Sequence, residues 1–269
     1  MRVSLAIFVA ALLLAPRAGL AQTATRSSDH SRAWVDVNLL GIANSSAPAT
    51  TFEFPFVTFG ESASIGAMYP KPARVRQFGL VDIGGGVMFG RFVGAGASWG
   101  RTAYEDVVGL TATIPHPVFF NAHATGTGAT DVALKRQEDA VNIFVAVVPY
   151  ESDRVQLRVY GGPSFFRYKA DMVQDIAYSQ TYSFTTTLNT ITITDFVQTD
   201  DVQGTNKGIG FNVGGDFAYF FTKIFGVGGG VRISRGTVTV GEEPMSEVSQ
   251  EIKVGGTLIF AGLRLRFGR

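Results

Sequence analysis

Four residues in one stretch of this sequence are of types that could carry chemistry. His116, His123, Asp131 and Glu138 would suit a metal site or a hydrolase built on serine, histidine and aspartate. Their spacing matches no metal motif, and the prolines on both sides of His116 favour a turn. We therefore expect no catalytic residue, no metal site and no cofactor, and we expect that the protein is not an enzyme.

A second set of charged residues stands inside segments where apolar and polar residues alternate. Five of these charges form a candidate network: Asp82, Arg158, Asp216, Arg232 and Arg264. Alternation with a period of two predicts β-strands, because successive side chains of a strand point to opposite faces. The strands that carry these charges are therefore expected to have one apolar face and one polar face.

The alternating segments come in pairs joined by very short turns. The predicted pairs are Phe78–Phe89 with Phe92–Thr102, Ala140–Val148 with Val155–Phe166, and Ile209–Tyr219 with Phe225–Ile233. A first strand, Ala33–Gly41, and a last strand, Ile252–Phe267, are expected to close the sheet against each other. Short turns at one end and long connections at the other are typical of a transmembrane antiparallel up-and-down β-barrel.

The N-terminus predicts a cleaved signal peptide over residues 1–21. Arg2 is followed by an apolar core from Leu5 to Ala15, and small residues precede the expected cleavage after Ala21. No other segment approaches the roughly 20 apolar residues of a transmembrane helix. The mature chain, residues 22–269, is expected to form one outer-membrane β-barrel domain without disulfides, since the sequence contains no cysteine.

The number of strands is open at this stage. A further hairpin, with Phe52, Phe54 and Phe56 on one arm and Ser62–Tyr69 on the other, either spans the membrane or stands above it. We prefer the second interpretation, which gives eight strands; the first gives ten. The connections Tyr104–Asp139, Lys169–Lys207 and Ser234–Glu251 are expected to be long loops outside the cell.

With the apolar face of each strand toward lipid, a polar set points into the barrel. Besides the five charges it contains Asn142, Gln156, Tyr160, Asn212 and Arg266. Two interpretations of this lining compete. It is either a network of ion pairs that fills a narrow lumen, or the selectivity lining of a narrow channel for ions or small solutes.

The outer face carries aromatic residues that are expected to form interfacial girdles: Trp99, Phe165, Phe217, Tyr219 and Phe267. Trp34 is expected to be an anchor of the same kind.

Several segments resemble bacterial outer-membrane β-barrel proteins of the porin-like group, with similarity to OmpA-type barrels. The segments are residues 78–86, the loop Ile114–Phe120, Tyr160–Phe166, Gly208–Asp216, Phe225–Arg232 and Gly262–Phe267. The resemblance implies contact with outer-membrane lipid and insertion by the barrel-assembly machinery, whose signal is a terminal strand ending in an aromatic residue. Here Phe267 is followed by Gly268 and Arg269. The resemblance implies no catalytic residues.

The expected function is therefore that of a small barrel in the outer membrane. We expect a charged, plugged lumen and a structural or interaction role at the cell envelope, with the narrow porin-like channel as the alternative. The net charge of +1 gives no electrostatic basis for binding nucleic acid.

Overall fold

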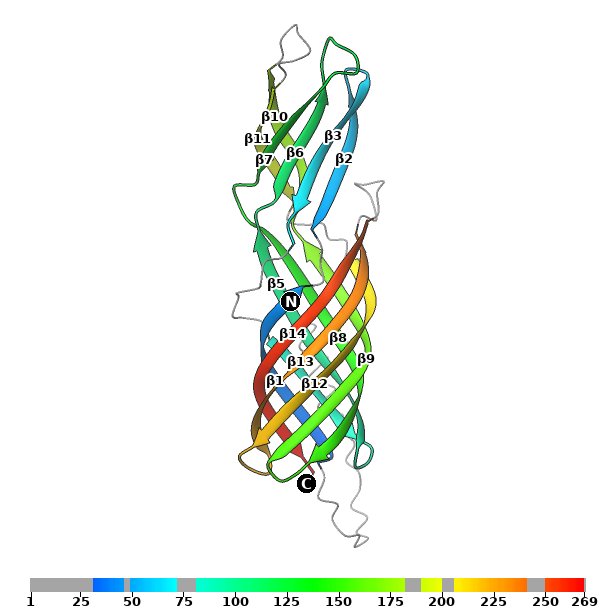
Figure 1. Cartoon of the computed structure of the whole chain (residues 1–269), viewed down its shortest axis with the longest axis vertical. Helices are drawn as coiled ribbons and strands as arrows, with labels where there is room; N and C mark the ends of the chain where they lie inside the picture. The colour runs from blue at the N-terminus through cyan, green and yellow to red at the C-terminus, as the bar shows by residue number, and fades with distance from the viewer. Residues whose placement is uncertain are drawn as a thin grey trace.

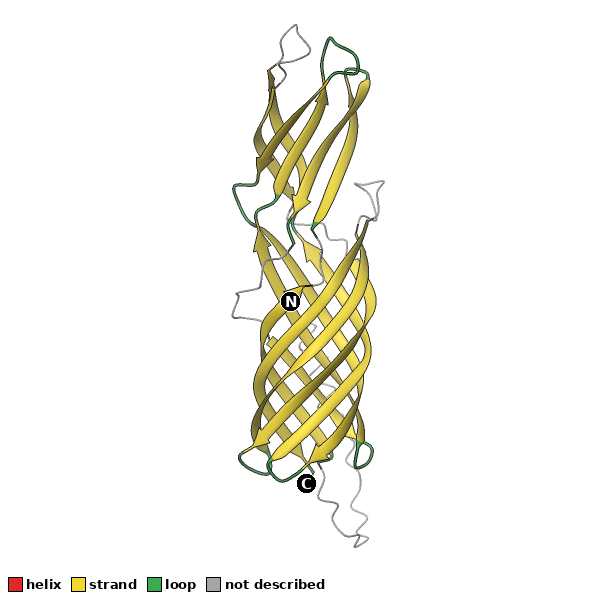
Figure 2. Cartoon of the chain, in the orientation of Figure 1, coloured by secondary structure: helices red, strands yellow, loops and turns green. Residues whose placement is uncertain are grey.

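The protein consists of a closed β-barrel and a smaller group of strands beyond one end of it (Figures 1 and 2). The computed structural model describes residues 31–45, 49–71, 81–181, 190–199, 206–240 and 250–268. Within these residues the chain forms fourteen β-strands. No helix in this part of the chain is long and apolar enough to cross a membrane.

The barrel contains eight antiparallel strands, as the sequence predicts. In their order around the barrel they are β1 (Ala33–Ser45), β14 (Gln250–Phe267), β13 (Phe225–Val240), β12 (Asn206–Phe220), β9 (Val155–Ala170), β8 (Leu134–Glu151), β5 (Val93–Asp106) and β4 (Val81–Met88). The first and last strands pair along their length, from Ala33 opposite Phe267 to Ser45 opposite Gly256. This pairing leaves no open edge, which a sheet in lipid requires.

The prediction of three long loops is wrong in detail. β5 runs on to Asp106, β8 begins at Leu134, and β13 reaches Val240, so the barrel wall is taller than the alternating apolar segments alone indicate. The first two connections also contain strands of their own.

Two predictions fall on residues outside the described part of the chain. They are the signal peptide, residues 1–21, and residues 78–80 of the predicted strand Phe78–Phe89.

The connections fold into a β-structure that we call the head. It contains a four-stranded sheet of β2 (Thr50–Thr58), β3 (Glu61–Tyr69), β6 (Gly109–Pro115) and β7 (His123–Ala129), and a hairpin of β10 (Met172–Thr181) and β11 (Thr190–Thr199). The early hairpin, β2 and β3, thus stands beyond the barrel, as preferred above. Figure 1 shows the head above the barrel, at the end opposite the C-terminus.

Apolar side chains hold the head sheet, the hairpin and the top of the barrel together. The buried cluster combines Tyr69 of β3, Leu110 of β6 and Leu134 of β8 with Val173 and Ile176 of β10. Burial raises the pKa of the Tyr69 phenol to about 12, so the hydroxyl stays protonated. It donates a hydrogen bond to the Asp171 carbonyl at 3.3 Å and accepts one from the Val173 N–H at 3.0 Å. The head is therefore a packed unit.

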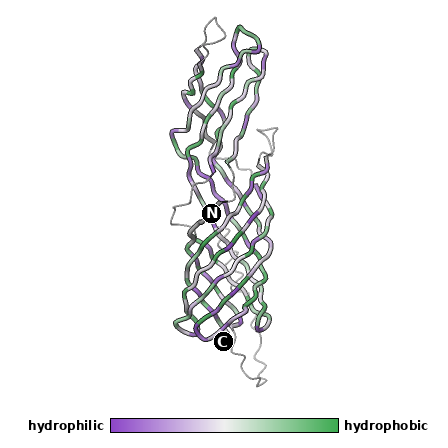
Figure 3. The backbone as a smooth tube through the Cα atoms, in the orientation of Figure 1, coloured by the Kyte–Doolittle hydropathy of each residue, from purple (hydrophilic) through white to green (hydrophobic). Residues whose placement is uncertain are grey.

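The two faces of the barrel wall exchange character part of the way along the strands. Figure 3 shows the apolar and polar residues that alternate along them. From Ile259 to Phe267, β14 turns apolar residues outward and Arg264 and Arg266 inward. Nearer the head the pattern is reversed, because Ile252 and Val254 are buried inside the wall and Lys253 is exposed outside it. The apolar outer segment matches the roughly 9–11 residues of a membrane-spanning strand. The wall above it is built as a water-facing barrel.

The deletion of the β10–β11 hairpin tests whether the head and the barrel fold separately. Replacing residues 172–205 with a short Gly-Ser linker removes Val173 and Ile176 from the head core but leaves the barrel pairing of β9 with β12. We expect the barrel to keep its heat-modifiable migration in SDS gels, and the head to be cleaved faster by protease. Loss of heat-modifiable migration would show that the barrel depends on the hairpin.

Candidate functional site

The barrel interior contains three arginines and three aspartates that form buried ion pairs. Arg158 lies 2.5 Å from Asp36 and 2.5 Å from Asp216, measured between side-chain nitrogen and oxygen. Arg232 lies 2.7 Å from Asp82, and Arg264 lies 3.5 Å from Asp36. All six side chains are at most a tenth exposed. Since the charges cancel, the lumen holds no net charge from this set.

Hydrogen bonds extend the ion pairs into one connected network. The Asn38 amide joins two parts of it: its nitrogen donates to Asp82 at 3.0 Å, and its oxygen accepts from Arg264 at 2.5 Å. Arg232 also donates to the Ser98 hydroxyl at 2.8 Å. From Ser98 the bonds continue through three further side chains, Asn142, Ser164 and Asn212.

The network contacts every strand of the barrel. Its members come from β1, β4, β5, β8, β9, β12, β13 and β14, so it crosses the lumen as well as joining neighbouring strands. Arginine suits this role because its planar guanidinium donates to several acceptors at once. The network therefore acts as a set of cross-links inside the barrel.

Aromatic rings fill the space beside the ion pairs. The Arg158 guanidinium lies over the Trp34 ring, 4.9 Å from its centre, and the Phe144 and Tyr160 ring centres are 4.9 Å apart. Glycines on the neighbouring strands, each paired directly with a ring-bearing residue, provide the room. A β-carbon at Gly86 would lie 2.3 Å from the Trp34 ring, and one at Gly96 would lie 2.8 Å from Phe144. These inward glycines thus permit large side chains to occupy a narrow lumen.

Arg266 closes the end of the barrel that carries the short turns. It donates to the backbone carbonyls of Lys223, at 3.0 Å, and Ser152, at 3.2 Å, and to that of Asp153. Its guanidinium also lies 3.8 Å from the centre of the Phe220 ring. One side chain therefore ties the β8–β9 turn to the β12–β13 turn across the floor of the lumen.

The structure places all ten inward residues of the sequence analysis inside the barrel, where each is buried. The lumen also contains Asp36, Asn38, Ser98, Ser164 and Phe144, which were not among the predicted inward residues. The prediction that Trp34 is an interfacial anchor is wrong, because this residue is 6% exposed and lies in the lumen. A charge count carried part of the missing signal: two predicted aspartates faced four arginines, and Asp36 and Glu151 supply further negative charges.

The predicted outer aromatics lie on the lipid side. Phe165, Phe217 and Phe267 are 43–49% exposed. Further aromatics surround the turn end, where Phe89 is 74% and Phe221 is 62% exposed. Exposed rings at a strand end are typical of an interfacial girdle.

The two histidines among the described residues, His116 and His123, belong to the head. His116 is buried, and its Nδ1 accepts hydrogen bonds from the N–H groups of Val118 and Phe119, both at 3.0 Å. This is the turn role that the flanking prolines predict. Glu138 instead lies in the barrel wall, where it accepts from the Gly255 N–H at 3.0 Å. The described residues contain no group of three histidines or carboxylates that could hold a metal ion.

The closed antiparallel barrel, its apolar outer belt and its charged interior define a transmembrane β-barrel protein of the bacterial outer-membrane class. No protein-family model matches the sequence, and a search of curated proteins finds no match. Among solved structures the chain is similar to the outer membrane protein OprG from Pseudomonas aeruginosa. The TM-score is 0.41 and the identity 7%, over 88% of this chain and 96% of OprG.

A second similar structure is Ail, the attachment invasion locus protein of Yersinia pestis, solved in complex with the heparin analogue sucrose octasulfate. Here the TM-score is 0.32 and the identity 10%, over 88% of this chain and 99% of Ail.

Removal of Arg158 tests how strongly the network stabilises the barrel. Arg158→Ala leaves Asp36 and Asp216 without their shared cation, and breaking a buried pair costs about 3–5 kcal/mol. Arg101→Ala is the matched control, because Arg101 pairs with Asp139 on the outer surface and its side chain is 44% exposed. Such a pair contributes at most about 1 kcal/mol. Denaturant unfolding in lipid vesicles measures both changes, and equal effects would contradict a structural role of the network.

A rescue variant separates lost charge pairing from lost packing. Arg158→Met combined with Asp216→Asn removes one charge of each sign, keeps the volume, and leaves Asp36 with its other partner, Arg264. We expect this double variant to regain most of the stability that Arg158→Ala loses. If it stays as unstable as Arg158→Ala, the guanidinium acts through packing or geometry instead.

Proposed function

We propose that this protein is a plugged barrel that anchors its head at the surface of the outer membrane, where the head takes part in interactions. The observation that carries the proposal is the neutral network that links all eight strands across the lumen. A selectivity lining would need unpaired charges along a hydrated path. Here Arg158, Arg232 and Arg264 are paired with aspartates, which supports the plug over the narrow channel. Arg266 lies near Glu151 and donates to backbone carbonyls.

Packing beside the network also supports a closed lumen. Trp34 and Phe144 are only 6% and 7% exposed although they lie inside the barrel. Toward the head, the interior contains a buried apolar cluster of Phe166, Val238 and Ile252 beside the buried Glu138. An apolar segment above a layer of paired charges would oppose the passage of hydrated ions, since burying an unpaired ion is costly.

The outer end of the head carries the feature that best fits an interaction role. Two turns meet there, because the Glu61 carboxylate accepts from the Asn121 N–H at 3.0 Å. Around this contact Phe59, Val118 and Phe120 are 56–74% exposed. Exposed apolar groups gathered on a folded support are typical of binding surfaces. By the usual asymmetry of these barrels, long connections face the outside of the cell, and so would the head.

Current through planar bilayers tests the plug. We expect the refolded mature chain to insert without steady openings, and Arg158→Ala to conduct, since it removes the central cation and the partner of the Trp34 ring. Arg101→Ala, which changes only the outer surface, should stay silent. Steady, charge-selective current through the wild type would overturn the plug and support the narrow channel.

A further inference from the structure

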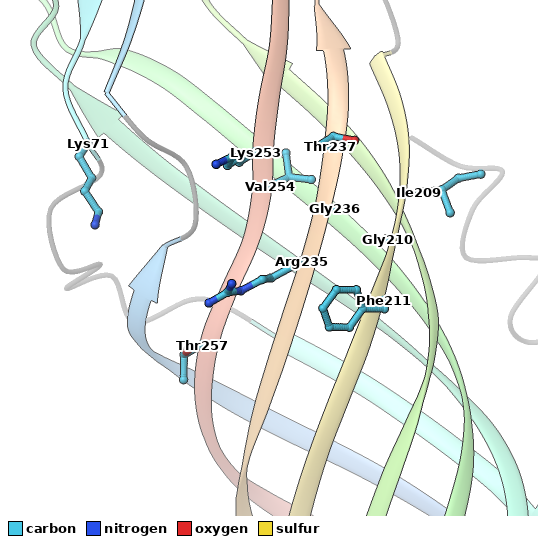
Figure 4. A pocket seen from close by; sticks show the side chains of 10 residues that line it. All are labelled: Lys71, Ile209, Gly210, Phe211, Arg235, Gly236, Thr237, Lys253, Val254 and Thr257. Carbon is cyan, nitrogen blue, oxygen red and sulfur yellow. The ribbon is translucent and has the colours of Figure 1, made fainter.

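A groove on the outer wall of the barrel is lined by both cations and apolar side chains (Figure 4). It measures about 600 Å³ and lies across β12, β13 and β14. Its cationic residues are Arg235, Lys253 and Lys71, the last from the segment that follows β3. Its apolar residues are Ile209 and Phe211 of β12.

Strand register fixes how these groups are arranged. Ile209 lies opposite Thr237, which in turn lies opposite Lys253, so these three form one row across the three strands. In the neighbouring row Phe211 lies opposite Arg235. Each row thus presents an apolar side chain on β12 and a cation one or two strands away.

The groove lies where the lipid-facing belt ends. On β13, Ile233 still belongs to the apolar belt, and Arg235 is the next outward residue. On β14 the outward residues change in the same way, from Ile259 through Thr257 to Lys253. In the membrane this is the level of the lipid headgroups on the head side of the bilayer.

The two cations on the barrel wall are exposed and lack a carboxylate among the described residues, unlike Arg101, which pairs with Asp139 at the same edge of the belt. Ile209 and Phe211 are 69% and 53% exposed on the outer face of β12. In Figure 4 Phe211 lies below Arg235, and Ile209 lies nearly level with Thr237. Exposed basic groups beside exposed apolar groups are complementary to an anionic headgroup and its acyl chain.

We propose that this groove binds a phosphorylated lipid of the leaflet on the head side. Arg235 and Lys253 hold the phosphate, Lys71 approaches it from the head, and an acyl chain lies along Ile209 and Phe211. Arginine and lysine are the usual phosphate ligands, the former through paired hydrogen bonds and the latter as a point charge. The proposal is independent of the plug, because the groove is on the outer wall and a conducting barrel would have it too.

Lipid retention by the refolded full chain in detergent tests the proposal. Native mass spectrometry compares dioleoyl phosphatidic acid with dioleoyl phosphatidylcholine, and inorganic phosphate is offered in a separate sample. We expect the wild type to retain phosphatidic acid roughly tenfold better than phosphatidylcholine, since each basic residue near the headgroup strengthens anionic-lipid binding. Inorganic phosphate alone should not be retained, because it has no acyl chain to contact Phe211.

Three variants locate the binding. Arg235→Ala with Lys253→Ala should abolish the preference for phosphatidic acid, and Phe211→Ser should weaken retention of both lipids. Arg101→Ala, a cation removed at the same edge of the belt, should behave as the wild type. Heat-modifiable migration confirms that each variant is folded.

Four results would overturn the proposal. The first three are equal retention of the two lipids by the wild type, an unchanged preference in the Arg235/Lys253 double variant, and an equal loss in Arg101→Ala. Retention of inorganic phosphate as strong as that of phosphatidic acid would also overturn it, because the site would then be a phosphate site and not a lipid site.

Discussion

The structure depends most on how charge is accommodated inside the barrel. An eight-stranded barrel has an interior just wide enough for side chains. An unpaired ion there would be costly, so each arginine needs an acceptor within reach. Arg158, Arg232 and Arg264 find theirs in three aspartates on other strands. The resulting network sets the register of strands distant in sequence and leaves the outer face free to be apolar.

A second constraint is the change of environment along each strand. Period-two alternation is kept throughout β14, but its sense is reversed between Lys253 and Ile259, where the wall leaves the membrane. Above that level, the interior contains a buried apolar cluster beside the charged side chains of Glu138 and Arg136, and the head packs on this cluster through shared residues such as Phe52. The same boundary places exposed cations beside exposed apolar groups. The apolar outer belt, the packing of the head and the proposed lipid groove therefore all follow from the passage of the barrel wall from lipid to water.

The barrel was predictable from the sequence because its signal is local. Alternation and short turns specify strand pairs, and they gave the eight strands, the pairing of the first strand with the last, and the inward residues. Trp34 and Asp36 were missed because tryptophan near a strand end also fits an interface, and only the partner Arg158 distinguishes the two positions. The head was predicted only in part. The hairpin of β2 and β3 was expected to stand beyond the barrel, whereas its sheet with β6 and β7 was not predicted, since it is fixed by long-range pairing such as that of β3 with β6. No local pattern specifies the groove, which arises from residues on three strands.

The most direct test of a filled lumen is the reactivity of a cysteine placed inside it. The chain contains no cysteine, so Ser98→Cys introduces a single thiol beside Arg232 with little change in volume. Exposed Ser179→Cys on the head provides the accessible reference. With the barrel in lipid vesicles, a small charged methanethiosulfonate should modify residue 179 rapidly and residue 98 only after unfolding. Equally rapid modification at residue 98 would show that the lumen is open to water and would contradict the account.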